Sequence, residues 1–95
     1  MIEVIGKAKR IDANRLVSVS CVKEGDGFVI HYHFSKDKDP EMRDFSVEVP
    51  AGEDVESLMP LYANAELFES EATELYGVRF KGNPSSGKRL FLEEK

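Results

Sequence analysis

The sequence predicts an α+β fold, in which two to three short helices pack on one face of an antiparallel β-meander of three to four strands. Residues 15–50 contain three runs of alternating apolar residues separated by short polar connections, a pattern typical of consecutive antiparallel strands. Apolar residues also recur at helical spacing near the N-terminus and again between Asn64 and Tyr76. We therefore expect one sheet, covered on one side by helices.

The size and charge of the chain limit the classes of protein to which it can belong. Its 95 residues suit one domain and are too few for two. The net charge is −5, so the chain lacks the basic face that a general nucleic-acid binder needs. No apolar run approaches the ~18 residues that would span a bilayer, and the N-terminus lacks a signal-peptide pattern. We expect a cytoplasmic protein with no nucleic-acid partner and no direct membrane insertion.

The N-terminal segment, residues 1–13, is predicted to form a short amphipathic helix. Its apolar residues recur at helical spacing, with basic residues between them, at Val4, Ile5, Ala8 and Ile11. A strand through Ile2 and Val4, broken at Gly6, is the alternative.

Residues 15–50 form the predicted meander. The first strand places Val17, Val19 and Cys21 on one side. Asp26-Gly27 suits a turn that needs positive φ, and the strand after it has one aromatic and aliphatic face, made of Phe28, Ile30, Tyr32 and Phe34. The polar stretch around Pro40 predicts an exposed loop. The third strand ends at Pro50 and points inward with Phe45, Val47 and Val49.

Residues 53–77 are predicted to be helical, with Pro60 limiting the first helix. The second begins at Asn64 or Ala65 and ends at Tyr76, followed by Gly77, the residue expected just past a helix end. Its predicted buried stripe is Leu67, Phe68, Ala72, Leu75 and Tyr76, while the residues predicted to point elsewhere are Glu66, Glu69, Ser70 and Thr73. Residues 78–95 are predicted to form an extended C-terminal arm.

A histidine pair is one candidate for chemistry. His31 and His33 lie two apart on a strand, so both imidazoles leave the same face. Structural zinc takes four ligands and catalytic zinc usually three from protein, and the chain has no third histidine. A free-standing module that binds a metal or small ligand on this face is the alternative function. The lone Cys21 excludes an internal disulfide and is most often a small buried hydrophobe.

A phosphate-loop frame near the C-terminus is a false positive. Gly82, Gly87 and Lys88 fit the spacing, but Arg89 stands where the motif needs Ser or Thr for magnesium. The short remainder of the chain is also unable to supply the helix that faces the phosphates.

Three carboxylates on the second predicted helix are a further candidate. Glu71 and Glu74 are neighbours on a helix, whereas Glu69 is turned roughly 200° from Glu71. A catalytic pair would need a pocket that raises its pKa values. Glu71 lies at the edge of the apolar stripe, so its carboxylate must either reach water or meet a donor, which is Arg79 or a group on a partner chain.

Residues 69–84, ESEATELYGVRFKGNP, resemble the signature of the 30-kDa subunit of respiratory complex I. That signature reads roughly Glu-Arg-Glu-x-x-Asp, a Leu or Met, a Phe or Tyr, then Gly, an Ile or Val, and x-Phe-x-Gly-His-Pro. The matching positions are Glu69, Glu71, Glu74, Leu75, Tyr76, Gly77, Val78, Phe80, Gly82 and Pro84. Ser70 and Asn83 depart from it, and Glu74 keeps the acidic character of the family's Asp but not its identity. Lys88-Arg89 resemble the family's Arg-Arg with a displacement of one residue.

The resemblance covers about Arg15 to Arg89 and is greatest to the short form of this subunit in membrane-bound, energy-converting nickel–iron hydrogenases. There, as here, the tryptophan typical of the complex I branch is absent, and Leu67 occupies its place.

The resemblance implies a peripheral assembly subunit that is not catalytic and carries no cofactor. Its implied partners are the large catalytic subunit and the neighbouring iron–sulfur subunit, and it would reach the membrane only through the complex. The implied interface residues are Glu69, Glu71, Glu74, Tyr76, Arg79, Phe80, Lys88 and Arg89. The implied structural residues are Gly77, Gly82 and Pro84.

Overall fold

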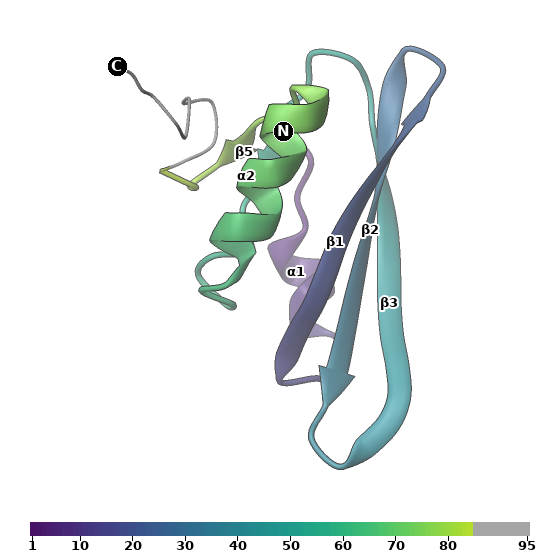
Figure 1. The fold of residues 1–95 in the computed structure, drawn as a ribbon, viewed down its shortest axis with the longest axis vertical. Coiled ribbons are helices and arrows are strands. Elements are labelled where there is room, and N and C mark those ends of the chain that lie inside the picture. The colour runs from purple at the N-terminus through teal and green to yellow at the C-terminus, as the bar shows by residue number, and fades with distance from the viewer. Residues whose placement is uncertain (85–95) are drawn as a thin grey trace.

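The computed structural model describes residues 1–84 and confirms the α+β class (Figure 1). Its elements in chain order are α1 (Ile5–Lys9), β1 (Arg15–Glu24), β2 (Gly27–Lys36), β3 (Asp39–Val49), β4 (Val55–Glu56), α2 (Ala65–Tyr76) and β5 (Phe80–Lys81). The strands β1, β2 and β3 form an antiparallel sheet in that order. Both helices lie on the same side of this sheet (Figure 1).

The inner face of the sheet carries the core. Tyr32 and Phe34 of β2 are fully buried, and the ring of Phe45 in β3 stacks against both. The strand alternation that predicted this face from the second and third runs is therefore confirmed.

A β-bulge changes which side chains of β1 face inward. The pairing register of β1 with β2 shifts between Leu16 and Ser18. Because a bulge adds one residue to a strand, the side chains before it and after it follow opposite inward and outward alternation. Leu16 consequently joins Val19 on the inner face and is buried, whereas Val17 is exposed. The prediction that Val17 shares a face with Val19 is wrong for this reason.

The β1–β2 turn lies one residue earlier than predicted. Glu24 pairs with Gly27, which leaves Gly25 and Asp26 as the turn, with Gly25 at φ 58°. Glycine is required at position 27 for a steric reason, because the Cβ of any other residue would lie too close to the carbonyl oxygen of Val49.

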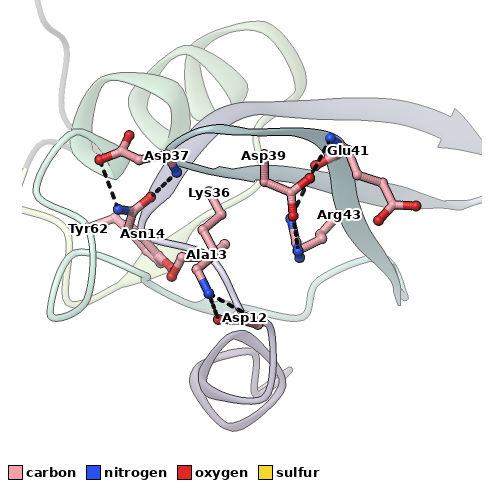
Figure 2. A network of polar contacts seen from close by, with 9 residues as sticks. All are labelled: Asp12, Ala13, Asn14, Lys36, Asp37, Asp39, Glu41, Arg43 and Tyr62. Carbon is pink, nitrogen blue, oxygen red and sulfur yellow. Dashed lines mark hydrogen bonds and ion pairs between the residues drawn. The ribbon is translucent and has the colours of Figure 1, made fainter.

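The polar segment around Pro40 is part of a hairpin, so the predicted exposed loop is wrong. Strand β2 continues to Lys36 and β3 starts at Asp39, with Lys38 in the turn at φ 67°. Ion pairs stabilise this end of the sheet (Figure 2). Lys36 Nζ lies 3.0 Å from the carboxylate of Asp12, and Arg43 Nη2 lies 2.7 Å from that of Asp39. The hydrogen bond from Arg43 holds the pKa of Asp39 below its usual range.

A second, parallel sheet replaces the first predicted helix of residues 53–77. Strand β4 pairs in parallel with β5, and Ile2 forms a parallel bridge to Val55 on β4. The chain thus runs β4–α2–β5, a strand–helix–strand crossover. After β4, the N–H of Tyr62 donates to the carbonyl of Leu58 at 2.9 Å, which makes a single helical turn.

The predicted extended arm of residues 78–95 begins as part of this second sheet. Val78 is 3% exposed and Phe80 is 2% exposed. Their burial makes the start of the arm an interior strand. Residues 85–95, including Lys88 and Arg89, lie outside the described residues.

The N-terminus combines both predicted alternatives. Ile2 extends along β4, and the helix that follows is limited to Ile5–Lys9, shorter than the predicted 1–13. The Glu56 carboxylate accepts hydrogen bonds from the N–H groups of Val4 and Ile5, each at 3.0 Å. This side chain satisfies donors that the first turn of a helix leaves free.

Helix α2 has the predicted bounds, and Gly77 caps it in the left-handed conformation at φ 79°. Its buried face was predicted correctly only in part: Ala72 is buried and Phe68 packs partly buried against the core, but the other fully buried residues are Ala65, Glu69 and Ser70. Leu67 is 76% exposed and Leu75 is 68% exposed. The helix packs against β1 and against β5 of the second sheet.

Candidate functional site

The first half of the signature segment builds a buried cluster around Glu69, which is fully buried. Its carboxylate accepts hydrogen bonds from the Ser57 hydroxyl at 2.7 Å, the Leu58 N–H at 2.8 Å and the Asn83 amide at 3.0 Å. We call these four residues the Glu69 cluster. It joins α2 to the segments that follow β4 and β5.

Glu69 was predicted to point away from the core, and this prediction is wrong. It was also predicted to be an interface residue, and its burial leaves it no exposed surface for a partner in this conformation. Its carboxylate is enclosed by its own chain, because α2 turns its small-residue face toward the second sheet. Ala65 and Ala72, one turn to either side of Glu69, were the available signal for that face. Phe80 is also buried, so it too is unavailable as an interface residue in this conformation.

Burial controls the ionisation of Glu69. Burial raises the pKa of its carboxyl above the ordinary 4.5, and the hydrogen bonds from Leu58, Ser57 and Asn83 oppose that rise. Nearby, burial also raises the pKa of Tyr32, and the charge of Glu69 adds to the effect. Within residues 1–84 the buried Tyr32 hydroxyl has no hydrogen-bond partner.

The raised pKa predicts a pH dependence of stability. A carboxyl whose pKa is higher in the folded state binds a proton that the unfolded state has released. Its contribution is therefore present below the unfolded pKa and lost as pH rises through the folded pKa. We expect the free energy of unfolding of the wild type, relative to Glu69→Gln, to fall as pH rises from about 4 to about 8. Urea titrations across this range measure it, and a difference that grows with pH would contradict the prediction.

The remaining described interface candidates lie on the surface. Glu71, Glu74 and Arg79 are exposed, and Tyr76 is 42% exposed while its ring contacts Phe28. Within residues 1–84 no ion pair joins Glu71 to Arg79. Of the two predicted donors for Glu71, the internal one is therefore excluded among these residues.

The predicted structural residues lie around the end of α2 and β5. Gly77 and Gly82 both have positive φ, at 79° and 101°, where a residue with a Cβ is strained. Pro84 is exposed and is the last described residue.

The histidine pair lies on the face of the sheet away from the helices. The rings of His31 and His33 stack with centroids 6.5 Å apart, and His33 Nδ1 lies 3.8 Å from the Asp44 carboxylate. The nearby Asp37 and Asp39 instead pair with Arg15 and Arg43. Among residues 1–84, no group of three or more His, Cys, Asp or Glu side chains is arranged to hold a metal ion.

Two surface residues were missed because they were assigned to the core. Leu67 and Leu75 were predicted to be buried, yet they flank Glu71 on the outer face of α2. The carboxylate at Glu71, between the two leucines, was a second signal for the orientation of α2, because it indicates that this stripe faces outward.

Comparison with known proteins then identifies the family. The model of the family described as "Respiratory-chain NADH dehydrogenase, 30 Kd subunit" matches residues 1–95. The chain belongs to this family. It is also 32% identical over 63 residues to the C/D subunit of NADH-quinone oxidoreductase from Bdellovibrio bacteriovorus, a match that covers 66% of this chain and 11% of that protein.

Membership of the 30-kDa subunit family confirms the resemblance carried by residues 69–84. In this member, the signature spans α2, its Gly77 cap and β5. No helix within residues 1–84 has the length and apolar character needed to cross a membrane.

Proposed function

We propose that this chain is a non-catalytic, peripheral assembly subunit of a membrane-bound, complex I-like oxidoreductase, in which it docks on the large catalytic subunit beside an iron–sulfur subunit. The observation that carries the proposal is the division of the family signature between two faces of α2. Glu69 faces inward and stabilises the chain's own fold. Glu71 and Glu74 face outward and have no ion pair within residues 1–84.

The name of the relative supports a place in a multi-subunit assembly. It describes a subunit of NADH-quinone oxidoreductase, and the match covers 11% of that protein.

The exposed carboxylates argue against the rival of a small enzyme. An acid–base pair needs burial or a partner that separates the two pKa values. Glu71 and Glu74 are both exposed on the outer face of α2. Their position suits contact with another protein better than proton transfer.

The hydrogenase branch is the more specific part of the proposal. It is supported by Leu67, which stands where the complex I branch carries tryptophan. Adjacent genes for a nickel-ligating large subunit would support this branch. Neighbouring genes for quinone-reducing subunits would instead place the chain in the complex I branch, with the docking role unchanged.

The docking role predicts the behaviour of two charge variants. We expect Glu71→Ala and Arg79→Ala to remain folded and to bind the large subunit about fivefold more weakly, because each removes an interfacial charge of modest worth. Affinity purification of a tagged chain, co-expressed with the large subunit from its own genome, measures this. Glu48→Ala, at an exposed charge on β3, is the matched control and should bind like the wild type. Failure of the wild-type chain to co-purify with any large subunit would refute the docking role.

A further inference from the structure

The outer face of α2 is apolar at its centre, which is unusual for a helix whose other side packs on its own chain. Leu67 and Leu75, two turns apart, are 76% and 68% exposed. Between them a surface depression of about 430 Å³ is lined by Leu67, Ser70, Glu71, Glu74 and Leu75. Leucine is normally buried in preference to alanine, but on α2 the leucines are exposed and the alanines are buried. An exposed apolar patch of this kind indicates an interaction site.

The apolar surface continues from the helix toward β1. A second depression, of about 220 Å³, shares Glu71 and Leu75 with the first and reaches Phe68 and Cys21. Glu71 and Leu75 therefore line both hollows, one on α2 and one between α2 and β1. We call Leu67, Glu71, Glu74 and Leu75 the α2 outer face.

The charge of this face decides what kind of molecule fits it. Glu71 and Glu74 have no ion pair within residues 1–84, and the last turn of α2 contains no basic residue. A second copy of the chain would bring two more carboxylates against these, and like charges across an interface are unfavourable. An anionic membrane surface is disfavoured for the same reason. A protein surface that carries basic groups is favoured.

We propose that the α2 outer face binds a segment of the large subunit that presents aliphatic or aromatic side chains flanked by Lys or Arg. The apolar side chains fill the two hollows beside Leu75, and the basic groups pair with Glu71 and Glu74. This inference rests on the proposed docking function and names the surface and the partner chemistry for it.

The test compares two paired variants of the full chain for binding to the purified large subunit. Leu67→Gln/Leu75→Gln keeps helix propensity and solubility while it removes the apolar contact. Its matched control is Val22→Thr/Met42→Gln, which changes two other exposed hydrophobic residues, on β1 and β3. We expect the first pair to raise Kd at least about tenfold and the control to stay within about twofold of the wild type.

A charge variant tests the second half of the proposal. We expect Glu71→Gln/Glu74→Gln to flatten the dependence of Kd on salt concentration, because screening acts on the pairs these carboxylates form. Circular dichroism and thermal melts establish that every variant is folded. If the leucine pair is unstable, the glutamate pair still decides whether this face takes part.

The outcomes separate the two proposals. If the wild type binds and both α2 pairs bind as it does, with the same salt dependence, the α2 inference is wrong, together with the expected effect of Glu71→Ala. Docking on the large subunit then stands through another surface of the chain. If the wild type does not bind the large subunit, both the docking function and the α2 inference are wrong. A concentration-dependent dimer of the free chain that the leucine pair abolishes would assign the face to a second copy and overturn the inference.

Discussion

Replacement of Glu69 by alanine should lower the free energy of unfolding by about 3 kcal/mol. The Glu69 carboxylate is the common acceptor for Ser57, Leu58 and Asn83. Its removal takes this acceptor from the Ser57 hydroxyl and the Leu58 N–H in the interior, whereas the Asn83 amide also donates to the Glu66 carbonyl. Each such buried group costs about 1–3 kcal/mol, and part of the sum is offset because the buried charge is also removed. A domain of this size has only ~5–10 kcal/mol of stability, so the loss is a large part of the total.

Urea unfolding followed by circular dichroism measures this loss, and a control on the same helix calibrates it. Glu71→Ala removes an exposed carboxylate with no ion pair within residues 1–84 and should change stability by less than about 0.5 kcal/mol. Equal losses for Glu69→Ala and Glu71→Ala would contradict the assignment of the two carboxylates to opposite faces of α2.

Replacement of Gly27 by alanine should destabilise the chain by about 2–4 kcal/mol. A Cβ at this position would overlap the carbonyl oxygen of Val49 and lie 3.1 Å from the Cα of Pro50. Both atoms belong to the backbone, so the clash is relieved only if the end of β3 moves away from β2. That movement disturbs the pair formed by Phe28 and Val49, which closes the core at this end of the sheet.

Thermal unfolding of Gly27→Ala is best compared with that of a second glycine variant. Gly6 lies inside α1, and a Cβ there would meet nothing within 4 Å. Alanine is preferred to glycine inside a helix by about 0.5–1 kcal/mol, so Gly6→Ala should be neutral or stabilising. A Gly27→Ala protein as stable as the wild type would show that β3 does not approach as closely as described.

Local pattern was sufficient for the elements whose periodicity is long and regular. The three meander strands and the bounds of α2 with its Gly77 cap follow from alternation, helical spacing and the conformational freedom of glycine. The short strands β4 and β5 could not be predicted from local pattern, because each contains two residues and they pair with each other across the length of α2. No local pattern in so few residues distinguishes a strand from a turn.

The candidate site shows the same limit at the level of side chains. The carboxylates of the signature and the resemblance to the 30-kDa subunit family could be read from residues 69–84. The orientation of the helix that carries these carboxylates could not be predicted from the sequence. Both leucines and both alanines of α2 lie on plausible stripes, and hydrophobicity favours burial of the leucines.

The sequence by itself determined the fold class, the family and the bounds of α2, because these depend on periodicity and on a contiguous signature. Only the tertiary structure decided that Glu69 is enclosed while Leu67 and Leu75 face solvent. The physical reason is the second sheet: β4 and β5 bring Ser57, Leu58 and Asn83 to one side of α2. Because these donors hydrogen-bond to the Glu69 carboxylate, the side of α2 that carries Glu69 and small residues faces the second sheet. The leucines therefore face solvent.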